Sequence, residues 1–325
     1  MKRPLLRVLC ASVVQSFSVA VIDIGSNSIK SLVAAQAPSG ELTVLASRSL
    51  DVRISAGINE ATPRLSEDGM TRGLEAIRAL LAEAATFAPA STVLVATSAV
   101  RDAQNGPDFR VRVKAATGQA IRILTGDEEA ELIGRGLTCD PALAALRDFY
   151  VFDLGGGSLE CLAFRGRHVQ RAVSLQLGCV RLTEKFVTDP AAPFAPALLP
   201  LIAAHCATAL AAAGFTFDLP PETIAIGTGG TITTVRAIVA AQRGVTLEAT
   251  PPDVSMETLR SQLREIGGLP LAARRQIAGL PPARADVFPV ALATLIAVAE
   301  RGHFPAFRHS LYNLRFGLAR EALGG

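Results

Sequence analysis

The chain has 325 residues; half are hydrophobic, 19% are charged, and the formal net charge is +3. This composition excludes an intrinsically disordered chain, and the length is typical of two domains. The small net charge excludes a surface that binds polyanions in general, so we expect no nucleic-acid partner and only local phosphate sites.

The N-terminus, residues 1–18, combines basic and apolar residues as a signal peptide does. Cleavage near Ala20 would cut into the strand that carries Asp23, so we interpret residues 1–18 as an N-terminal extension. The uncharged run 191–217 contains three prolines, and the apolar run 287–299 is too short to span a bilayer. The cysteines are scattered without a C-x-x-C pair and the histidines lack ligand spacing. These features predict a cytoplasmic protein without a membrane partner, a disulfide framework or a transition-metal site.

The first lobe begins with three predicted strands. A helix follows with Ser66 as its N-cap, and strands then alternate with helices. The order is β-β-β-α-β-α-β-α, and its later members are STVLVAT (91–97), a helix over 107–117, AIRIL (120–124) and a helix in DEEAELIGRG (127–136).

The same order starts again at residue 149, with FYVFDLG, LECLAFRG, HVQRAVSL and a later strand that enters a helix at Gly229. Overlaid at an offset of 130, the two halves share identical residues at Val21/Val151, Asp23/Asp153, Gly25/Gly155, Ser28/Ser158 and Leu32/Leu162. An internal duplication explains both observations. The sequence therefore predicts an α/β protein whose two similar lobes flank a central cleft.

Each lobe carries an Asp-x-Gly turn after a buried strand, and GTGGT (227–231) forms a third glycine-rich turn before a helix. Glycine lets the backbone approach a ligand, and exposed N–H groups and a helix N-terminus bind phosphate. A tight hairpin would explain one such turn, but three favour phosphate binding. The spacing fits neither a Walker P-loop nor a dinucleotide fingerprint. The predicted substrate-binding residues are Ser26, Asn27, Ser28, Gly155, Gly156, Gly157, Ser158, Gly229, Gly230 and Thr231.

Taken together, DIGSNSIKSLVA (23–34), DLGGGSLE (153–160) and GTGGT resemble the three phosphate loops of the exopolyphosphatase / guanosine pentaphosphate phosphatase family, which belongs to the actin–hexokinase–acetate kinase superfamily. Further matching segments occur in the same order: ATSAVRDAQNGPDF (96–109), TGDEEAELIGRG (125–136), LGCVRLTEKF (177–186) and RADVFP (284–289). The resemblance spans about residues 19–320.

The resemblance implies two ribonuclease-H-like lobes of the actin-like ATPase type, in the short two-domain form of the family. Lobe I is expected over residues 19–126, with the C-terminal helix 309–325 packed back on it, and lobe II over 127–308. Longer members carry a further helical domain, for which this chain has no counterpart. A homodimer stays open as an alternative assembly.

The resemblance also implies residue roles. Glu129, the second glutamate of G-x-E-E-A, would be the general base, and Arg101 would contact phosphate. Asp153 and Glu160 would surround Mg²⁺, with Asp23, the symmetry mate of Asp153, positioning metal or water. Since successive helix residues point about 100° apart, only one of the neighbouring glutamates should face the substrate. Weaker candidates for guiding a polyanion are Lys30, Arg181 and Lys185.

One departure from the family pattern is Phe316, which replaces a glutamate and leaves Arg315 in place.

The expected function is Mg²⁺-dependent hydrolysis of the terminal phosphate of inorganic polyphosphate. Guanosine pentaphosphate is the closest alternative substrate. A small-molecule kinase of the superfamily and a non-catalytic sensor of polyphosphate or alarmone are further alternatives.

Overall fold

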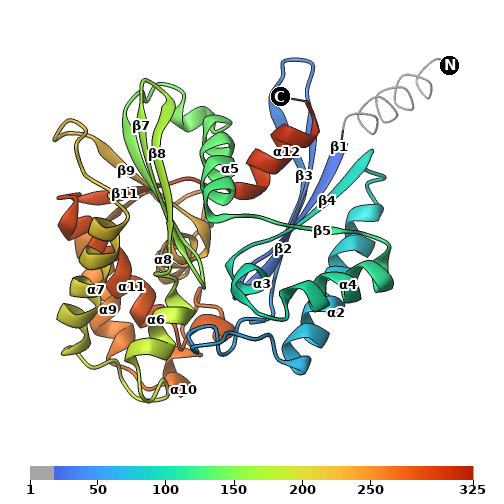
Figure 1. Cartoon of the computed structure of the whole chain (residues 1–325). Helices are drawn as coiled ribbons and strands as arrows, with labels where there is room; N and C mark the ends of the chain where they lie inside the picture. The colour runs from blue at the N-terminus through green and yellow to red at the C-terminus, as the bar shows by residue number, and fades with distance from the viewer. Residues whose placement is uncertain (1–17, 325) are drawn as a thin grey trace. The chain divides into compact units, whose positions relative to one another are not determined.

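The computed structural model describes residues 18–324 (Figure 1). Of the predicted extension, residues 1–17 lie outside this range, and Ser18 is already the first residue of a strand. The chain divides into two compact units. Unit 1 contains the described residues up to Ala56, Thr62–Pro141 and those from Tyr312 on, and unit 2 contains Gly57–Ala61 and Ala142–Leu311.

Unit 1 is built on a five-stranded sheet with the strand order β3-β2-β1-β4-β5. The first three strands are antiparallel, whereas β4 and β5 run parallel to β1. The central strand β1 is buried over almost its whole length, as its apolar sequence requires. The strands are β1 (Ser18–Ile24), β2 (Ser28–Gln36), β3 (Leu42–Asp51), β4 (Ser91–Ala96) and β5 (Ile121–Ile123).

Two of the longer helices of unit 1, α2 and α5, start at residues whose side chains cap them. Ser66 accepts a hydrogen bond from the N–H of Gly69, as predicted for the first helix, and Thr125 caps α5 in the same way. The helices are α2 (Glu67–Ala85), α3 (Ser98–Asp102), α4 (Gly106–Thr117), α5 (Gly126–Thr138) and α12 (Leu314–Ala322).

Unit 2 is built on a six-stranded sheet with the order β10-β11-β9-β6-β7-β8. Its strands are β6 (Phe149–Leu154), β7 (Leu159–Arg165), β8 (His168–Leu175), β9 (Ile224–Thr228), β10 (Asp253–Ser255) and β11 (Ala306–His309). Its helices are α6 (Cys179–Phe186), α7 (Leu198–Ala212), α8 (Gly229–Arg243), α9 (Met256–Gly267), α10 (Leu271–Arg274) and α11 (Phe288–Arg301). The short 3₁₀ turns are η1 (Pro141–Leu143) and η2 (Pro282–Arg284).

The two sheets repeat one topology. Reading β3-β2-β1-β4-β5 in unit 1 against β8-β7-β6-β9-β11 in unit 2 gives the same order of antiparallel and parallel neighbours, with β10 added at one edge. The predicted fold class, two ribonuclease-H-like α/β lobes, is confirmed. The apolar run 287–299 forms the buried helix α11. Within residues 18–324, no helix combines the length and apolar character that crossing a membrane demands.

The boundary between the units differs from the expected one. We placed the start of the second lobe at residue 127, but α5 belongs to unit 1, and unit 2 resumes after Pro141. The reason is the packing of α5 against α12, which lie side by side in Figure 1. A Cβ atom on Gly136 or Gly317 would overlap a backbone carbonyl from the opposite segment, so only glycine allows this approach.

Candidate active site

The acidic residues of unit 2 lie in one row across the sheet. Asp153 on β6 is directly opposite Glu160 on β7, and Glu160 is opposite Ser174 on β8. On its other side Asp153 is in register with Thr228 on β9. Opposed residues of neighbouring strands project from the same face. The hairpin expected to bring both carboxylates together is therefore present.

This row fits a divalent cation. Like charges directly opposite each other in a sheet repel, and Glu160 is buried, with Oε1 accepting a hydrogen bond of 2.7 Å from the hydroxyl of Ser174. A Mg²⁺ ion bound to carboxylates directly or through water would offset that repulsion. Among the described residues, no three His, Cys, Asp or Glu side chains gather as a metal cluster. A site in this row would depend on water or substrate oxygens for its remaining ligands.

The second glycine turn, residues 155–158, rests on the N-terminus of α6. The carbonyls of Gly155 and Gly156 accept hydrogen bonds from Cys179 N and Val180 N at 3.0 and 2.8 Å. The carbonyl of Gly157 accepts from Nε of Arg181 at 3.0 Å. A turn that binds phosphate must direct N–H groups and not carbonyls at the anion. Here residues of α6 donate hydrogen bonds to the carbonyls of all three glycines, which leaves the carbonyls directed at the helix.

The third glycine turn reaches the carboxylate of Asp153. Gly229 has φ +85°, and a Cβ atom at this position would overlap Oδ1 of Asp153. The hydroxyl of Thr231 donates to the carbonyl of Leu154 at 3.3 Å, which ties the first turn of α8 to the end of β6. This turn therefore needs glycine for its conformation and for its contact with the acidic row.

Sequence reasoning missed Arg284. It ends η2, and a Cβ atom on Gly230 would overlap its guanidinium group. The arginine therefore lies against the third glycine turn. Its segment RADVFP was recognised as a matching segment without a role for any member, because no spacing rule connects it to GTGGT.

In unit 1, the first turn after Asp23 is held by side-chain hydrogen bonds to α3 and to the segment after β3. Ser26, Asn27 and Ser28 are all buried. The hydroxyl of Ser26 lies 3.0 Å from the hydroxyl of Ser98, at the start of α3. Oδ1 of Asn27 accepts from Nε of Arg53 at 3.2 Å, so part of its polar side chain already holds the turn.

The partner opposite Asp23 differs from that of Asp153. Asp23 is in register with Lys30 on β2. Burial raises the pKa of Asp23 above its ordinary value, while the charges of Lys30 and Arg315 act to lower it. Of the weaker candidates for guiding substrate, Lys30 thus lies beside the carboxylate of the first turn.

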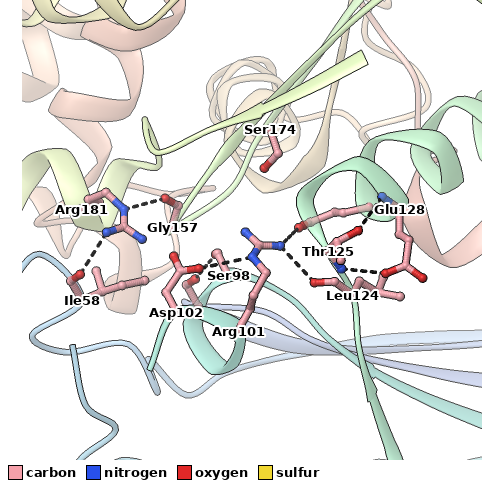
Figure 2. A network of polar contacts seen from close by, with 12 residues as sticks. Ile58, Ser98, Arg101, Asp102, Leu124, Thr125, Glu128, Gly157, Ser174 and Arg181 are labelled. Carbon is pink, nitrogen blue, oxygen red and sulfur yellow. Dashed lines mark hydrogen bonds and ion pairs between the residues drawn. The ribbon is translucent and has the colours of Figure 1, made fainter. Parts of the chain in front are cut away.

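The structure separates the two neighbouring glutamates of α5. Glu128 closes a capping box with Thr125: its carboxylate accepts from Thr125 N at 2.8 Å, and Thr125 Oγ1 accepts from Glu128 N at 3.2 Å (Figure 2). Arg122 also donates to the carboxylate of Glu128, at 2.9 Å. The bond from the Thr125 backbone, and after it the bond from Arg122, hold the pKa of Glu128 below its ordinary value. Glu128 is therefore committed to the helix start.

Glu129 points the other way and is buried. Its Oε2 lies 2.9 Å from Nη1 of Arg101, and the same nitrogen donates to the carbonyl of Leu124 at 3.3 Å. Nε of Arg101 donates to Asp102 at 3.2 Å, and Figure 2 shows the guanidinium between Asp102 and Leu124. The expected general base and the expected phosphate-contacting arginine thus form an ion pair in unit 1.

The other weaker candidates have structural contacts. Arg181 is buried, and its Nη1 donates to the carbonyl of Ile58 at 3.0 Å in addition to its bond with Gly157 (Figure 2). Arg181 therefore supports the second glycine turn through the carbonyl of Gly157. Lys185 lies 3.4 Å from Nε2 of His205 on the exposed side of α6.

Phe316, at the position of the expected glutamate, is buried and packs against the ring of Tyr312 in a tilted arrangement, with ring centroids 4.2 Å apart. Arg315 donates to the carbonyl of Ser31 at 2.9 Å and to the hydroxyl of Ser47 at 3.1 Å. The aromatic replacement therefore serves packing in unit 1, and Arg315 ties α12 to the sheet.

Known proteins share the family pattern and the fold of this chain. The model of the Ppx/GppA phosphatase family matches residues 32–324. An exopolyphosphatase from Cytophaga hutchinsonii is 23% identical over 94% of this chain and 97% of its own, with a TM-score of 0.83. The PPX-GPPA enzyme of Aquifex aeolicus is 24% identical over 94% of this chain and 99% of its own, with a TM-score of 0.74. These two likenesses show a shared fold, and the family match covers most of the chain. The chain belongs to the Ppx/GppA phosphatase family.

Proposed function

We propose that the protein is an exopolyphosphatase that releases terminal orthophosphate from inorganic polyphosphate by hydrolysis. Family membership supports a phosphoanhydride hydrolase. The observation that carries the proposal is the ion pair between buried Glu129 and half-buried Arg101, in which a carboxylate lies beside a planar guanidinium suited to binding phosphate.

In the proposed reaction, the glycine turns bind the oxygens of the phosphate chain through backbone N–H groups. Arg101 contacts the terminal phosphoryl group, and Glu129 orients a water molecule and accepts its proton as the water oxygen bonds to the terminal phosphorus. The bond from that phosphorus to the bridging oxygen breaks, and its electron pair stays with the shortened chain. Positioning of water and stabilisation of the spreading negative charge supply most of the catalysis in phosphoryl transfer. The freed chain end leaves one phosphate shorter.

Asp153 and Glu160 are the residues that would hold Mg²⁺. When bound, the ion would neutralise charge on the phosphate oxygens. The glycine at position 229 supports this assignment, because its missing side chain leaves Oδ1 of Asp153 accessible to the third turn. The proposed cation requirement is tested by phosphate release after removal of divalent metal with EDTA and after restoration of Mg²⁺.

Guanosine pentaphosphate is the second candidate substrate, because removal of its terminal 5′ phosphate needs the same groups and the family match does not separate the two activities. Released phosphate is measured with both substrates at equal concentrations. Faster release from polyphosphate supports the proposal. A preference for guanosine pentaphosphate would replace it with the second activity.

The test of the mechanism is Glu129→Gln, with Glu128→Gln as the matched control. We expect Glu129→Gln to lower phosphate release by at least about 100-fold, since general-base catalysis contributes that much or more. Binding of tripolyphosphate, measured by calorimetry, should survive. Glu128→Gln should keep its turnover within a few fold, because Glu128 caps the helix. Retained turnover in Glu129→Gln would remove the residue from its proposed role.

A further inference from the structure

A buried histidine of unit 2 has no part in the proposed reaction but lies behind the third glycine turn. His309 is the last residue of β11 and is in register with Gly227 of β9, the residue where GTGGT begins. The following residue, Ser310, donates its backbone N–H to the carbonyl of Gly227 at 3.0 Å. The end of β11 thus runs beside the start of the turn.

The hydrogen bonds of His309 have one consistent direction. Nη1 of Arg236 lies 2.8 Å from Nδ1 of His309. Arginine can only donate, so Nδ1 accepts and the neutral ring carries its proton on Nε2. Nε2 lies 3.1 Å from the hydroxyl of Thr233, which in turn donates to the carbonyl of Gly229 at 2.7 Å. The resulting chain runs from Arg236 through His309 and Thr233 to Gly229.

Arg236, the first residue of this series of hydrogen bonds, is itself held by further hydrogen bonds. Nη2 of Arg236 donates to the carbonyls of Leu247 and Thr250 at 2.7 and 2.8 Å, and Nε donates to the hydroxyl of Thr250 at 3.2 Å. Arg236 and His309 are both buried. Burial, and then the charge of Arg236, lower the pKa of His309 to about 4, which agrees with a neutral ring at neutral pH.

The end of the chain is the residue whose position matters most for the turn. Two successive glycines, 229 and 230, leave the start of α8 with little conformational restriction of its own. Gly229 contacts the carboxylate of Asp153 so closely that a side chain would not fit. A small rotation of this first helical turn would therefore change both the direction of its N–H groups and their distance from the acidic row.

We propose that His309 is a positioning residue: the chain Arg236–His309–Thr233–Gly229 holds the first turn of α8 in the orientation that binds substrate phosphate. This inference rests on the proposed function of GTGGT as a phosphate loop. His309 does not touch substrate in this role. It acts through Thr233.

The test compares two replacements of the same ring. His309→Asn retains an acceptor for Arg236 but is too short to reach Thr233, whereas His309→Gln extends an amide donor toward it. Thr233→Val removes the hydroxyl with little change of shape. Thr294→Val is the control, because Thr294 is buried in α11 and, among the residues that the structure describes, its hydroxyl bonds to the carbonyl one turn back, at 2.8 Å.

For polyphosphate hydrolysis, we expect His309→Asn and Thr233→Val each to raise KM about threefold to tenfold, as expected for one lost hydrogen bond. kcat should change less than about twofold. The double variant should be no worse than either single variant, because both interrupt one chain. His309→Gln should recover much of the affinity, and Thr294→Val should retain wild-type KM. Unchanged KM in both single variants, or multiplied effects in the double variant, would overturn the proposal.

A second measurement separates this proposal from the proposed function. Amide hydrogen exchange of the first turn of α8 should be faster in His309→Asn than in the wild type, whether or not the protein hydrolyses either substrate. A wild type that neither releases phosphate nor binds tripolyphosphate would refute the proposed function. Unchanged exchange in α8 would refute the positioning role even in an active enzyme.

Discussion

The burial of His309 predicts a specific dependence of stability on pH. The folded protein holds the pKa of His309 at about 4, against an ordinary value of 6.5. Between these values the unfolded chain binds a proton that the folded chain does not, so stability falls as pH falls from about 6.5 to about 4. Above 6.5 this contribution is fully present. The pKa of His309 is lowered first by burial and then by the charge of Arg236 on α8. The neighbouring strand, β10, carries Asp253, but its carboxylate is paired with Arg308.

The magnitude follows from the shift. Each pH unit within this range corresponds to about 1.4 kcal/mol, so protonation of the unfolded chain at pH 4.5 should cost the wild type about 2.5 kcal/mol relative to pH 7.5. His309→Asn cannot titrate. The variant should be the less stable protein at pH 7.5, where it has lost a hydrogen bond, and this gap should shrink by about 2.5 kcal/mol at pH 4.5.

The assay is urea unfolding followed by far-UV circular dichroism, because the chain contains no tryptophan and only two tyrosines. Wild type, His309→Asn and Thr294→Val are measured at about pH 4.5, 5.5, 6.5 and 7.5, which covers most of the range between the two pKa values and extends above it. Carboxylates affect all three proteins alike, so the difference between wild type and His309→Asn isolates the imidazole. A difference that stays constant within about 0.5 kcal/mol would refute a buried neutral histidine.

Two further changes test unit 1. Gly317→Ala should lower the stability of the fold by about 2 kcal/mol or more, because the added Cβ would overlap the carbonyl of Leu132 where α5 and α12 cross; an unchanged melting temperature in circular dichroism would contradict this. Arg101→Lys should lower phosphate release at least about tenfold, because a lysine cannot present a planar fork to both Glu129 and a phosphate. Wild-type kcat/KM in that variant would exclude the shared contact.

The strands and the duplication could be predicted because their signals are local. Each lobe begins with apolar strands that end in Asp-x-Gly, and the identical residues at a fixed offset define equivalent positions. The role of Glu129 came from the family resemblance alone and stays a prediction. Thr125-x-x-Glu128, by contrast, is a capping-box pattern visible in the sequence, which assigns Glu128 to the helix start. Here the local rules of helix capping suffice to separate the two glutamates.

Other features depend on contacts between distant segments. Nothing in the residues around 127 shows that α5 packs on α12; that contact is made by Gly136 and Gly317, which lie far apart in the sequence in two different helices. Arg284 and His309 belong to no motif with a spacing rule, and the third glycine turn meets both only after the sheet has formed. These contacts depend on long-range packing, which the periodicity of apolar residues in the sequence does not predict.

The duplication also explains how two similar lobes came to differ in chemistry. Residues 30 and 160 are equivalent positions, each directly opposite the aspartate that ends the first strand of its sheet. In unit 1 this position is Lys30, so the carboxylate of Asp23 already faces a cation. In unit 2 it is Glu160, and two carboxylates face each other. A divalent cation therefore complements the hairpin of unit 2 better than that of unit 1, where an equivalent ion would meet the charge of Lys30. The duplicated backbone thus carries opposite charges at the equivalent positions 30 and 160, and the proposed division of roles follows: metal binding by unit 2, and water activation by the Glu129–Arg101 pair of unit 1.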